Sequence, residues 1–224
     1  MSDITVAIMQ PYWVPYAGYF RLFEAADIFI VLDTVQFPRR GYVHRNKLLS
    51  GNGTPEWLTL PLKKAPRDVK ISDLEFHPDG AALFEEQRGK FPVLDSGFGL
   101  IDEEVSNLDG SIRDFLIVTL KLFQSRLTSP CEWVLASQLP DPCVSGQDRI
   151  LKLVQEVGGN RYLNSPGGGD LYSQDLFDSN GVELCFLEPW SGSNLSILQE
   201  CSSTTAHNEI RTAIINQSKF QSRS

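Results

Sequence analysis

The stretch that decides the fold is Gln10-Pro11-Tyr12-Trp13-Val14-Pro15-Tyr16-Ala17-Gly18-Tyr19-Phe20, which lies between two short apolar runs at 4–9 and 28–32. Both runs have the composition of buried strands, and each ends in a polar segment that favours a turn. Apolar residues recur at helical spacing across 16–26. Residues 4–32 therefore predict a strand, a loop, a helix and a second strand that is parallel to the first. An open α/β sheet of this kind presents a ligand site at the carboxyl ends of its strands.

The rest of the chain predicts a single α/β domain over residues 1–224, with a mainly parallel open sheet and a start like that of nucleotidyl-transferase and Rossmann folds. Gly51-Asn52-Gly53 predicts a β-hairpin made of 43–49 and 56–62. We expect this hairpin and the helices after it to form an insertion at 43–127, and residues 219–224 to fray. The other predicted strands are 69–76, 132–136, 161–164 and 182–187, and the other predicted helices are 81–90, 101–107, 112–127, 146–157, 171–180 and 210–215.

The composition excludes several classes of protein. The net charge of −8 and the isoelectric point near 4.9 argue against an extended nucleic-acid surface and against polybasic membrane binding. No apolar run approaches the roughly 20 residues that span a bilayer, and no secretory signal precedes the first strand. We therefore expect a cytoplasmic protein with no membrane partner. The four cysteines form no Cys-x-x-Cys pair, so the sequence predicts no metal site.

Cations gather in one part of this acidic chain. Residues 39–70 carry a net charge of +6, so the other 192 residues carry −14. One interpretation is a site for an anionic small molecule. The other is a solvated hairpin face whose lysines and arginines protect an edge strand. Charge alone does not separate the two.

The loop after the first strand holds the first group of candidate ligand-binding residues. It is aromatic and rich in proline, so it is neither a Gly-x-Gly-x-x-Gly motif nor a P-loop. Tyr12, Trp13 and Tyr16 can stack on a base or a sugar, or they can pack under the loop as core. Gln10 is a polar side chain at the tip of a buried strand, where a ligand would satisfy it. The candidate residues of this loop are Gln10, Tyr12, Tyr16 and Tyr19.

Asp33 and His44 are the candidate catalytic residues. Asp33 follows the second strand, where a carboxylate can bind a ribose hydroxyl or accept a proton, or can simply cap the turn. His44 lies among polar residues, so it is the best candidate for a general base, although a lone histidine is often structural. If 43–49 is a strand, His44 and Asn46 share one face while Arg45 and Lys47 share the other. The neighbouring candidate ligand-binding residues are Gln36, Arg39, Arg40, Arg45, Asn46 and Lys63.

A glycine-rich segment follows the predicted strand 161–164. It contains three more candidate ligand-binding residues, Asn164, Ser165 and Gly168. Glycines let backbone N–H groups approach a ligand closely. The alternative is a flexible loop with no binding role.

Many of these residues also carry a resemblance to a known family. The chain resembles the WbqC-like protein family most densely in its N-terminal part, and more weakly in Gln147-Asp148-Arg149-Ile150-Leu151, at 159–169 and in Leu195-Ser196-Ile197. The last 35 residues depart from the family pattern: the connection after Leu187 is short, and Gln199 stands where an acidic residue is common. The segments that carry the N-terminal resemblance are Ala7-Ile8-Met9-Gln10-Pro11-Tyr12, Pro15-Tyr16-Ala17-Gly18-Tyr19-Phe20, Asp33-Thr34-Val35-Gln36-Phe37, Arg39-Arg40-Gly41, Arg45-Asn46-Lys47 and Trp57-Leu58-Thr59-Leu60-Pro61-Leu62-Lys63-Lys64.

The resemblance implies a role in O-antigen or modified amino-sugar biosynthesis. It implies an acyl or aminoacyl transferase, with glycine as one suggested group, that forms an amide on the amine of a nucleotide-linked sugar. In this role the aromatic loop would stack on the base or sugar, and His44 or Asp33 would deprotonate the amine. The residues that would hold the diphosphate are Arg39, Arg40, Arg45 and Lys63.

Two alternatives to this transferase stay open. The strand-loop-helix-strand start is similar in arrangement to pantothenate synthetase, which forms an amide through an acyl-adenylate and uses a His-x-Gly-His signature. Here Tyr16-Ala17-Gly18-Tyr19 stands at that place, so no known motif supports the use of ATP and magnesium. The second alternative is a nucleotide-sugar-binding protein without catalysis. The acyl donor stays open between a thioester, an aminoacyl-tRNA and an amino acid with ATP, although the acidic chain argues against an extended tRNA footprint.

Overall fold

A six-stranded sheet forms the centre of the molecule in a computed structural model, which describes residues 3–95, 99–201 and 204–222. The strand order is β5-β2-β1-β6-β7-β8, and every pair is parallel except β7 with β8. The predicted α/β fold with a mainly parallel open sheet is thereby confirmed. The strands are β1 (Thr5–Met9), β2 (Ile28–Val31), β5 (Glu132–Leu135), β6 (Arg161–Asn164), β7 (Glu183–Leu187) and β8 (Phe220–Ser222).

The order of the strands contains a topological switch point between β1 and β6. From β1 the chain builds outward through β2 to β5, and it then returns to place β6 and β7 on the other side of β1. Loops that leave neighbouring strands in opposite directions open a crevice at the carboxyl edge of the sheet. The loops after β1, β2 and β6 therefore meet at one edge.

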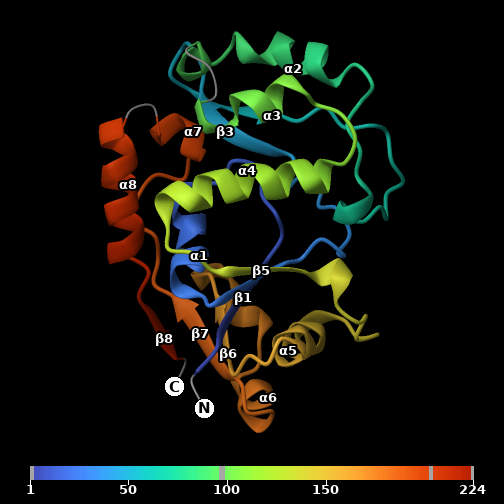
Figure 1. Ribbon diagram of the computed structural model, residues 1–224, viewed down its shortest axis with the longest axis vertical. Helices are drawn as coiled ribbons and strands as arrows, with labels where there is room; N and C mark the ends of the chain where they lie inside the picture. The colour runs from blue at the N-terminus through green and yellow to red at the C-terminus, as the bar shows by residue number, and fades with distance from the viewer. Residues whose placement is uncertain (1–2, 96–98, 202–203, 223–224) are drawn as a thin grey trace.

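Helices cover both faces of the sheet, because the inner strands are apolar on both sides. Phe29 of β2 packs on one face with Phe23 and Phe123, whereas Ile30 packs on the other face with Leu151 and Val154. Figure 1 shows α4 along one side of the sheet and α5 and α6 on the other. The elements that cover the sheet are η1 (Ala17–Phe20), α1 (Arg21–Ala25), α4 (Ile112–Leu127), α5 (Gly146–Glu156), α6 (Gln174–Ser179), α7 (Ile197–Glu200) and α8 (Thr204–Asn216), with η5 (Ala136–Gln138) and η6 (Pro166–Leu171) after two of the strands.

The hairpin lies at the end of the molecule opposite α5 and α6 (Figure 1). Its strands are β3 (Arg45–Leu49) and β4 (Pro55–Thr59), paired antiparallel as predicted. Leu48 and Leu58 join the core that covers one face of the sheet, so the insertion is continuous with the main domain. The other elements of the insertion are η2 (Ile71–Asp73), α2 (Gly80–Arg88), η3 (Pro92–Leu94), η4 (Gly99–Ile101) and α3 (Asp102–Ser106).

Three predicted elements differ from the structure. The strand expected at 69–76 is wrong: Ile71–Asp73 is a 3-10 helix, since Lys70 bridges to Gln36 but Phe76 bridges to Leu62. The terminal helix runs over Thr204–Asn216 and is longer than the predicted 210–215. Fraying was expected at 219–224, but Phe220–Ser222 forms β8 on β7; residues 223–224 lie outside the described part of the chain.

Gly159 gives a test of how closely β1 and β6 are packed. A Cβ atom at Gly159 would lie 2.4 Å from a methyl group of Val6 and 3.0 Å from one of Val154. We expect Gly159→Ala to lower the free energy of unfolding by about 1–3 kcal/mol in urea denaturation, because the added methyl group overpacks this contact. Gly167→Ala is the control, since nothing lies within 4 Å of a Cβ there. Equal unfolding free energies for the two variants would contradict this packing.

Candidate functional site

The carboxylate of Asp33 joins three parts of the fold behind the candidate site. Asp33 follows β2 and is fully buried. Its Oδ1 accepts a hydrogen bond from Ser137 N (3.0 Å), and its Oδ2 accepts one from Ser137 Oγ (2.6 Å). Arg113 Nη1 of α4 lies 3.8 Å from Oδ2, and Ser72 N of η2 donates to the Asp33 carbonyl (2.9 Å). Asp33 therefore fixes η5, η2 and α4 at the end of β2, and its predicted role as a base stays a prediction.

Several predicted ligand-binding side chains also hold the loop 36–41 in place. Arg39 Nη2 donates to the carbonyls of Ala65 (2.8 Å) and Pro66 (2.6 Å), and Gln36 Nε2 donates to the carbonyl of Arg67 (2.8 Å). Arg45 Nη2 donates to the carbonyl of Arg40 (2.9 Å). These partners are neutral carbonyls rather than carboxylates, so the positive charge of each arginine is kept.

The two faces of the hairpin have different roles, as the alternation of its side chains predicted. Asn46 is buried, and its Nδ2 donates to the carbonyl of Val14 (2.9 Å). On the opposite face, the Trp57 ring lies 4.1 Å from the Arg45 guanidinium and 5.1 Å from the Lys47 ammonium. Asn46 thus attaches the hairpin to the aromatic loop, while the outer face carries an aromatic ring between two cations.

The aromatic loop after β1 is held in a strained conformation. Val14 has a φ of 38°, which is unusual for a β-branched residue and costs on the order of 1–3 kcal/mol. The Val14 carbonyl accepts a hydrogen bond from Ser196 Oγ (2.7 Å) as well as the one from Asn46. The hairpin and the segment before α7 therefore both hold this turn in place. Trp13 is buried core, whereas Tyr12 and Tyr16 are half-buried.

A line of aromatic rings connects this loop to the hairpin. The ring centroids of Tyr19 and Tyr12 are 5.4 Å apart, those of Tyr12 and Tyr42 are 5.8 Å apart, and those of Tyr42 and Trp57 are 5.5 Å apart. Tyr19 is buried, and its hydroxyl donates to the Gln10 carbonyl (2.8 Å). It therefore anchors the inner end of the line of rings to the backbone after β1. Burial raises the pKa of Tyr12 and of Tyr16, so both stay neutral phenols.

Three predicted site residues meet in one cavity, which we call the histidine cavity. It has a volume of about 400 Å³, and Arg39, His44, Lys63 and Lys64 line it with Phe37. The His44 ring lies edge-on to Phe37 with 4.9 Å between centroids, and its buried Nδ1 makes no hydrogen bond to the described residues. Burial, with Arg45 and Arg39 nearby, lowers the pKa of His44 to about 4. His44 is therefore a neutral imidazole at pH 7.

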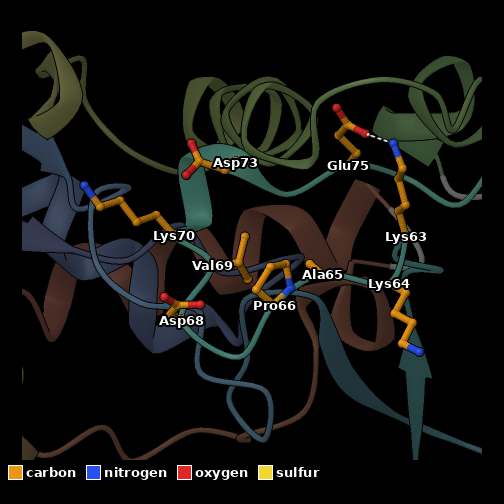
Figure 2. Close-up of a pocket in the computed structure, with 9 residues that line it drawn as sticks. All are labelled: Lys63, Lys64, Ala65, Pro66, Asp68, Val69, Lys70, Asp73 and Glu75. Atoms are coloured by element: carbon orange, nitrogen blue, oxygen red, sulfur yellow. Dashed lines mark hydrogen bonds and ion pairs between the residues drawn. The ribbon is translucent and has the colours of Figure 1, made fainter.

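A second cavity of about 500 Å³ adjoins the first, and we call it the lysine cavity (Figure 2). Lys63, Lys64 and Ala65 form walls of both cavities. Lys63 Nζ pairs with Glu75 Oε2 at 2.6 Å on one side, and Figure 2 shows Asp68, Lys70 and Asp73 on the other side. Lys64 and Lys70 have no carboxylate partner in the described part of the chain. The cavity therefore presents two unpaired lysines, and its lining also contains the carboxylates of Asp68, Asp73 and Glu75.

The glycine-rich segment lies elsewhere, at the carboxyl edge of the sheet. Asn164 ends β6 and is buried, and its Oδ1 accepts a hydrogen bond from Ser165 N (2.7 Å). A Cβ at Gly168 would lie 2.4 Å from Asn164 Nδ2, so glycine lets η6 fold over this amide. Because β1 and β6 are neighbours, Gln10 and Asn164 stand at the same edge. Seven of the predicted site residues thus form two groups: an edge group of Gln10, Asn164, Ser165 and Gly168, and a cavity group of Arg39, His44 and Lys63. Arg45 and Tyr12 belong to neither group.

Four polar or aromatic residues at these places were not among the site residues predicted from the sequence. Arg113 of α4 faces Asp33, and Arg149 of α5 donates through Nη2 to Thr34 Oγ1 (2.8 Å). Tyr42 and Trp57 belong to the line of aromatic rings. Strand alternation places Trp57 beside Arg45 and could have identified it. The positions of Arg113 and Arg149 depend on how distant helices pack against β2, which has no local sequence signal.

Among residues 3–95, 99–201 and 204–222, no cluster of three or more histidine, cysteine or acidic side chains could hold a metal ion. In the same residues, no helix has the length and apolar character needed to cross a membrane.

Asp33 gives a test of how the site is supported. Asp33→Ala removes the acceptor of both Ser137 hydrogen bonds, so we expect the free energy of unfolding in urea to fall by about 1–3 kcal/mol. Asp68→Ala is the matched control, because Asp68 is exposed and has no described partner, and we expect it to stay within about 0.5 kcal/mol of the parent protein. An Asp33→Ala variant as stable as the control would contradict this supporting role.

Comparison with known proteins gives the family. Residues 10–193 match the WbqC-like protein family, from the aromatic loop to the segment after β7. Rv1507c, described as an uncharacterized protein of Mycobacterium tuberculosis, is 24% identical over 201 residues, which cover 82% of this chain and 81% of that protein. No solved structure matches the chain. Since the match spans both the cavity group and the edge group, the chain belongs to the WbqC-like protein family.

Proposed function

We propose that the protein is a transferase that forms an amide on the amine of a nucleotide-linked amino sugar. The transferred group is an acyl or aminoacyl group, with glycine as one candidate. One observation carries this proposal: Arg39, Lys63 and Lys64 line a single cavity with the neutral imidazole of His44. Cations suit the diphosphate of such a substrate, and an unprotonated imidazole suits the removal of a proton from its amine.

The cations are available to a phosphate. Lys64 has no carboxylate partner within the described residues. The pair between Lys63 and Glu75 is more than half exposed at both side chains, and exposed pairs contribute about 0–1 kcal/mol. A diphosphate can therefore displace Glu75 at little cost. Arg39 is anchored to neutral carbonyls, which orients its guanidinium without neutralising it.

His44 would transfer one proton during the reaction. The amine nitrogen attacks the acyl carbonyl, the new C–N bond forms, and His44 takes the proton that the nitrogen loses. The bond to the leaving group then breaks, and the leaving group receives that proton. Burial, Arg45 and Arg39 lower the pKa of His44, so a diphosphate that neutralises Arg39 in the cavity would raise the pKa toward the range of an effective base.

The order of the strands supports a second candidate function, in which ATP activates the acyl group. The sheet order β5-β2-β1-β6-β7, with a switch point beside β1, is typical of open sheets that bind nucleotides. An ATP-dependent ligase that works through an acyl-adenylate is therefore the second candidate, by analogy of fold alone. In either role we place the reaction in the cytoplasm, because all four cysteines are free thiols.

Mass spectrometry of the sugar product tests the proposal. A panel of nucleotide-linked amino sugars is incubated with an acyl thioester, an aminoacyl-tRNA, or an amino acid with ATP and magnesium. We expect one combination to give an acylated sugar, and His44→Gln to lower its rate by about 10²–10⁴-fold while the substrate Kd stays within threefold. His207→Gln on α8 is the matched control and should keep the parent rate.

Three other results would change the proposal. Full turnover by His44→Gln would show that His44 takes no part in the reaction. Nucleotide-sugar binding without product from any donor would favour a binding protein without catalysis. Product that appears only with ATP would identify the ligase.

A further inference from the structure

Arg149 is a partly buried cation whose charge has no described counter-ion. It lies in the first turns of α5, and its Nη2 donates to the hydroxyl of Thr34, the third residue after β2 ends at Val31. Its Nε is buried and makes no hydrogen bond to the described residues. No carboxylate in the described part of the chain pairs with its guanidinium. A cation held partly out of water without a counter-ion lowers stability, and a bound anion would offset that cost.

Two more unused donors lie at the same edge of the sheet. Asn164 is 5% exposed, and its Oδ1 is occupied while its Nδ2 donates to no acceptor among the described residues. Gln10 follows β1, and its half-buried side-chain amide likewise has no described partner. Thus α5, the loop after β1 and the end of β6 each contribute a side chain with a free N–H group.

Arg149 reaches the loop after β2 through Thr34, while Gln10 and Asn164 stand at the ends of β1 and β6. Parallel neighbours lie about 4.8 Å apart, so the ends of β2, β1 and β6 span roughly 10 Å. That is about the length of a diphosphate with a hydrogen bond of about 2.9 Å at each end. The switch point between β1 and β6 is also where open α/β sheets bind their ligands.

The unused N–H donors of these three side chains indicate the kind of ligand that would bind them. All three side chains offer unused N–H donors, and one of them carries a positive charge. A ligand that satisfies them must be rich in acceptors and negatively charged. We propose that Arg149, Gln10 and Asn164 form a binding site for a phosphate or diphosphate group at the carboxyl edge of the sheet. This site is distinct from the histidine cavity, and it does not depend on the transferase reaction.

Calorimetric titration with inorganic pyrophosphate tests the site. We expect the parent protein to bind pyrophosphate and Arg149→Gln to bind it at least tenfold more weakly. Lys152→Gln is the matched control: it changes the same charge on the same helix, but Lys152 is exposed, so its affinity should stay within twofold. Without ligand, Arg149→Gln should melt at the same temperature as the parent or higher, because no ion pair is lost. A purely structural arginine would give a lower melting temperature.

Further titrations separate the sources of the anion and the two sites. ADP and UDP should bind at least as tightly as pyrophosphate if the phosphate belongs to a nucleotide, whereas citrate should bind more weakly than either. Gln10→Ala removes a side chain without described partners, so it tests the site even if Arg149→Gln does not fold, and it should weaken pyrophosphate binding at least threefold.

Three results would overturn the proposal. These are no pyrophosphate binding by the parent protein, parent affinity in both Arg149→Gln and Gln10→Ala, or a loss of affinity in Lys64→Ala with none in Arg149→Gln. The last result would place the anion in the histidine cavity or the lysine cavity. None of these results depends on whether a sugar is acylated.

Discussion

The buried carboxylate of Asp33 is the constraint on which the arrangement of the site depends. Its two oxygens hold Ser137 after β5, and Arg113 lies beside it from α4. The residues that follow Asp33 lead first to Thr34, which contacts Arg149, and then to Phe37 and Arg39 in the wall of the histidine cavity. One buried acid at the end of a strand thus fixes the sheet edge and the insertion relative to each other.

The cation cluster keeps its charge because of how its members are anchored. Arg39 and Arg45 donate to backbone carbonyls, which hold the guanidinium groups in place without neutralising them. Carboxylate partners would have given tighter ion pairs but would have removed the field that an anionic ligand needs. Burial, together with the same field, lowers the pKa of His44 and keeps it neutral at pH 7. We therefore propose that anion binding and the protonation of His44 are coupled.

Local patterns predicted the elements but not all of their partners. The apolar runs at 4–9 and 28–32 and the Gly-Asn-Gly turn were sufficient for the parallel pair and the hairpin, because these depend on residues close in sequence. Alternation along the hairpin correctly separated Asn46 from Arg45. The sequence did not reveal β8, since pairing with β7 and the contact of Phe220 with Arg161 join distant segments. For the same reason it missed Arg149, whose role depends on how α5 packs beneath β2.

Nuclear magnetic resonance can measure the pKa of His44 and whether a bound anion changes it. With the protein labelled at its histidine rings, the His44 resonance is followed from pH 8 to pH 3, without ligand and with a saturating nucleotide sugar. We predict a pKa of about 4 without ligand, because burial and the two arginines disfavour the imidazolium, and a higher pKa when a diphosphate in the cavity neutralises Arg39. His207 serves as the internal reference. An ordinary pKa near 6.5 without ligand, or a pKa that the bound ligand leaves unchanged, would contradict the coupling of His44 to an anion site.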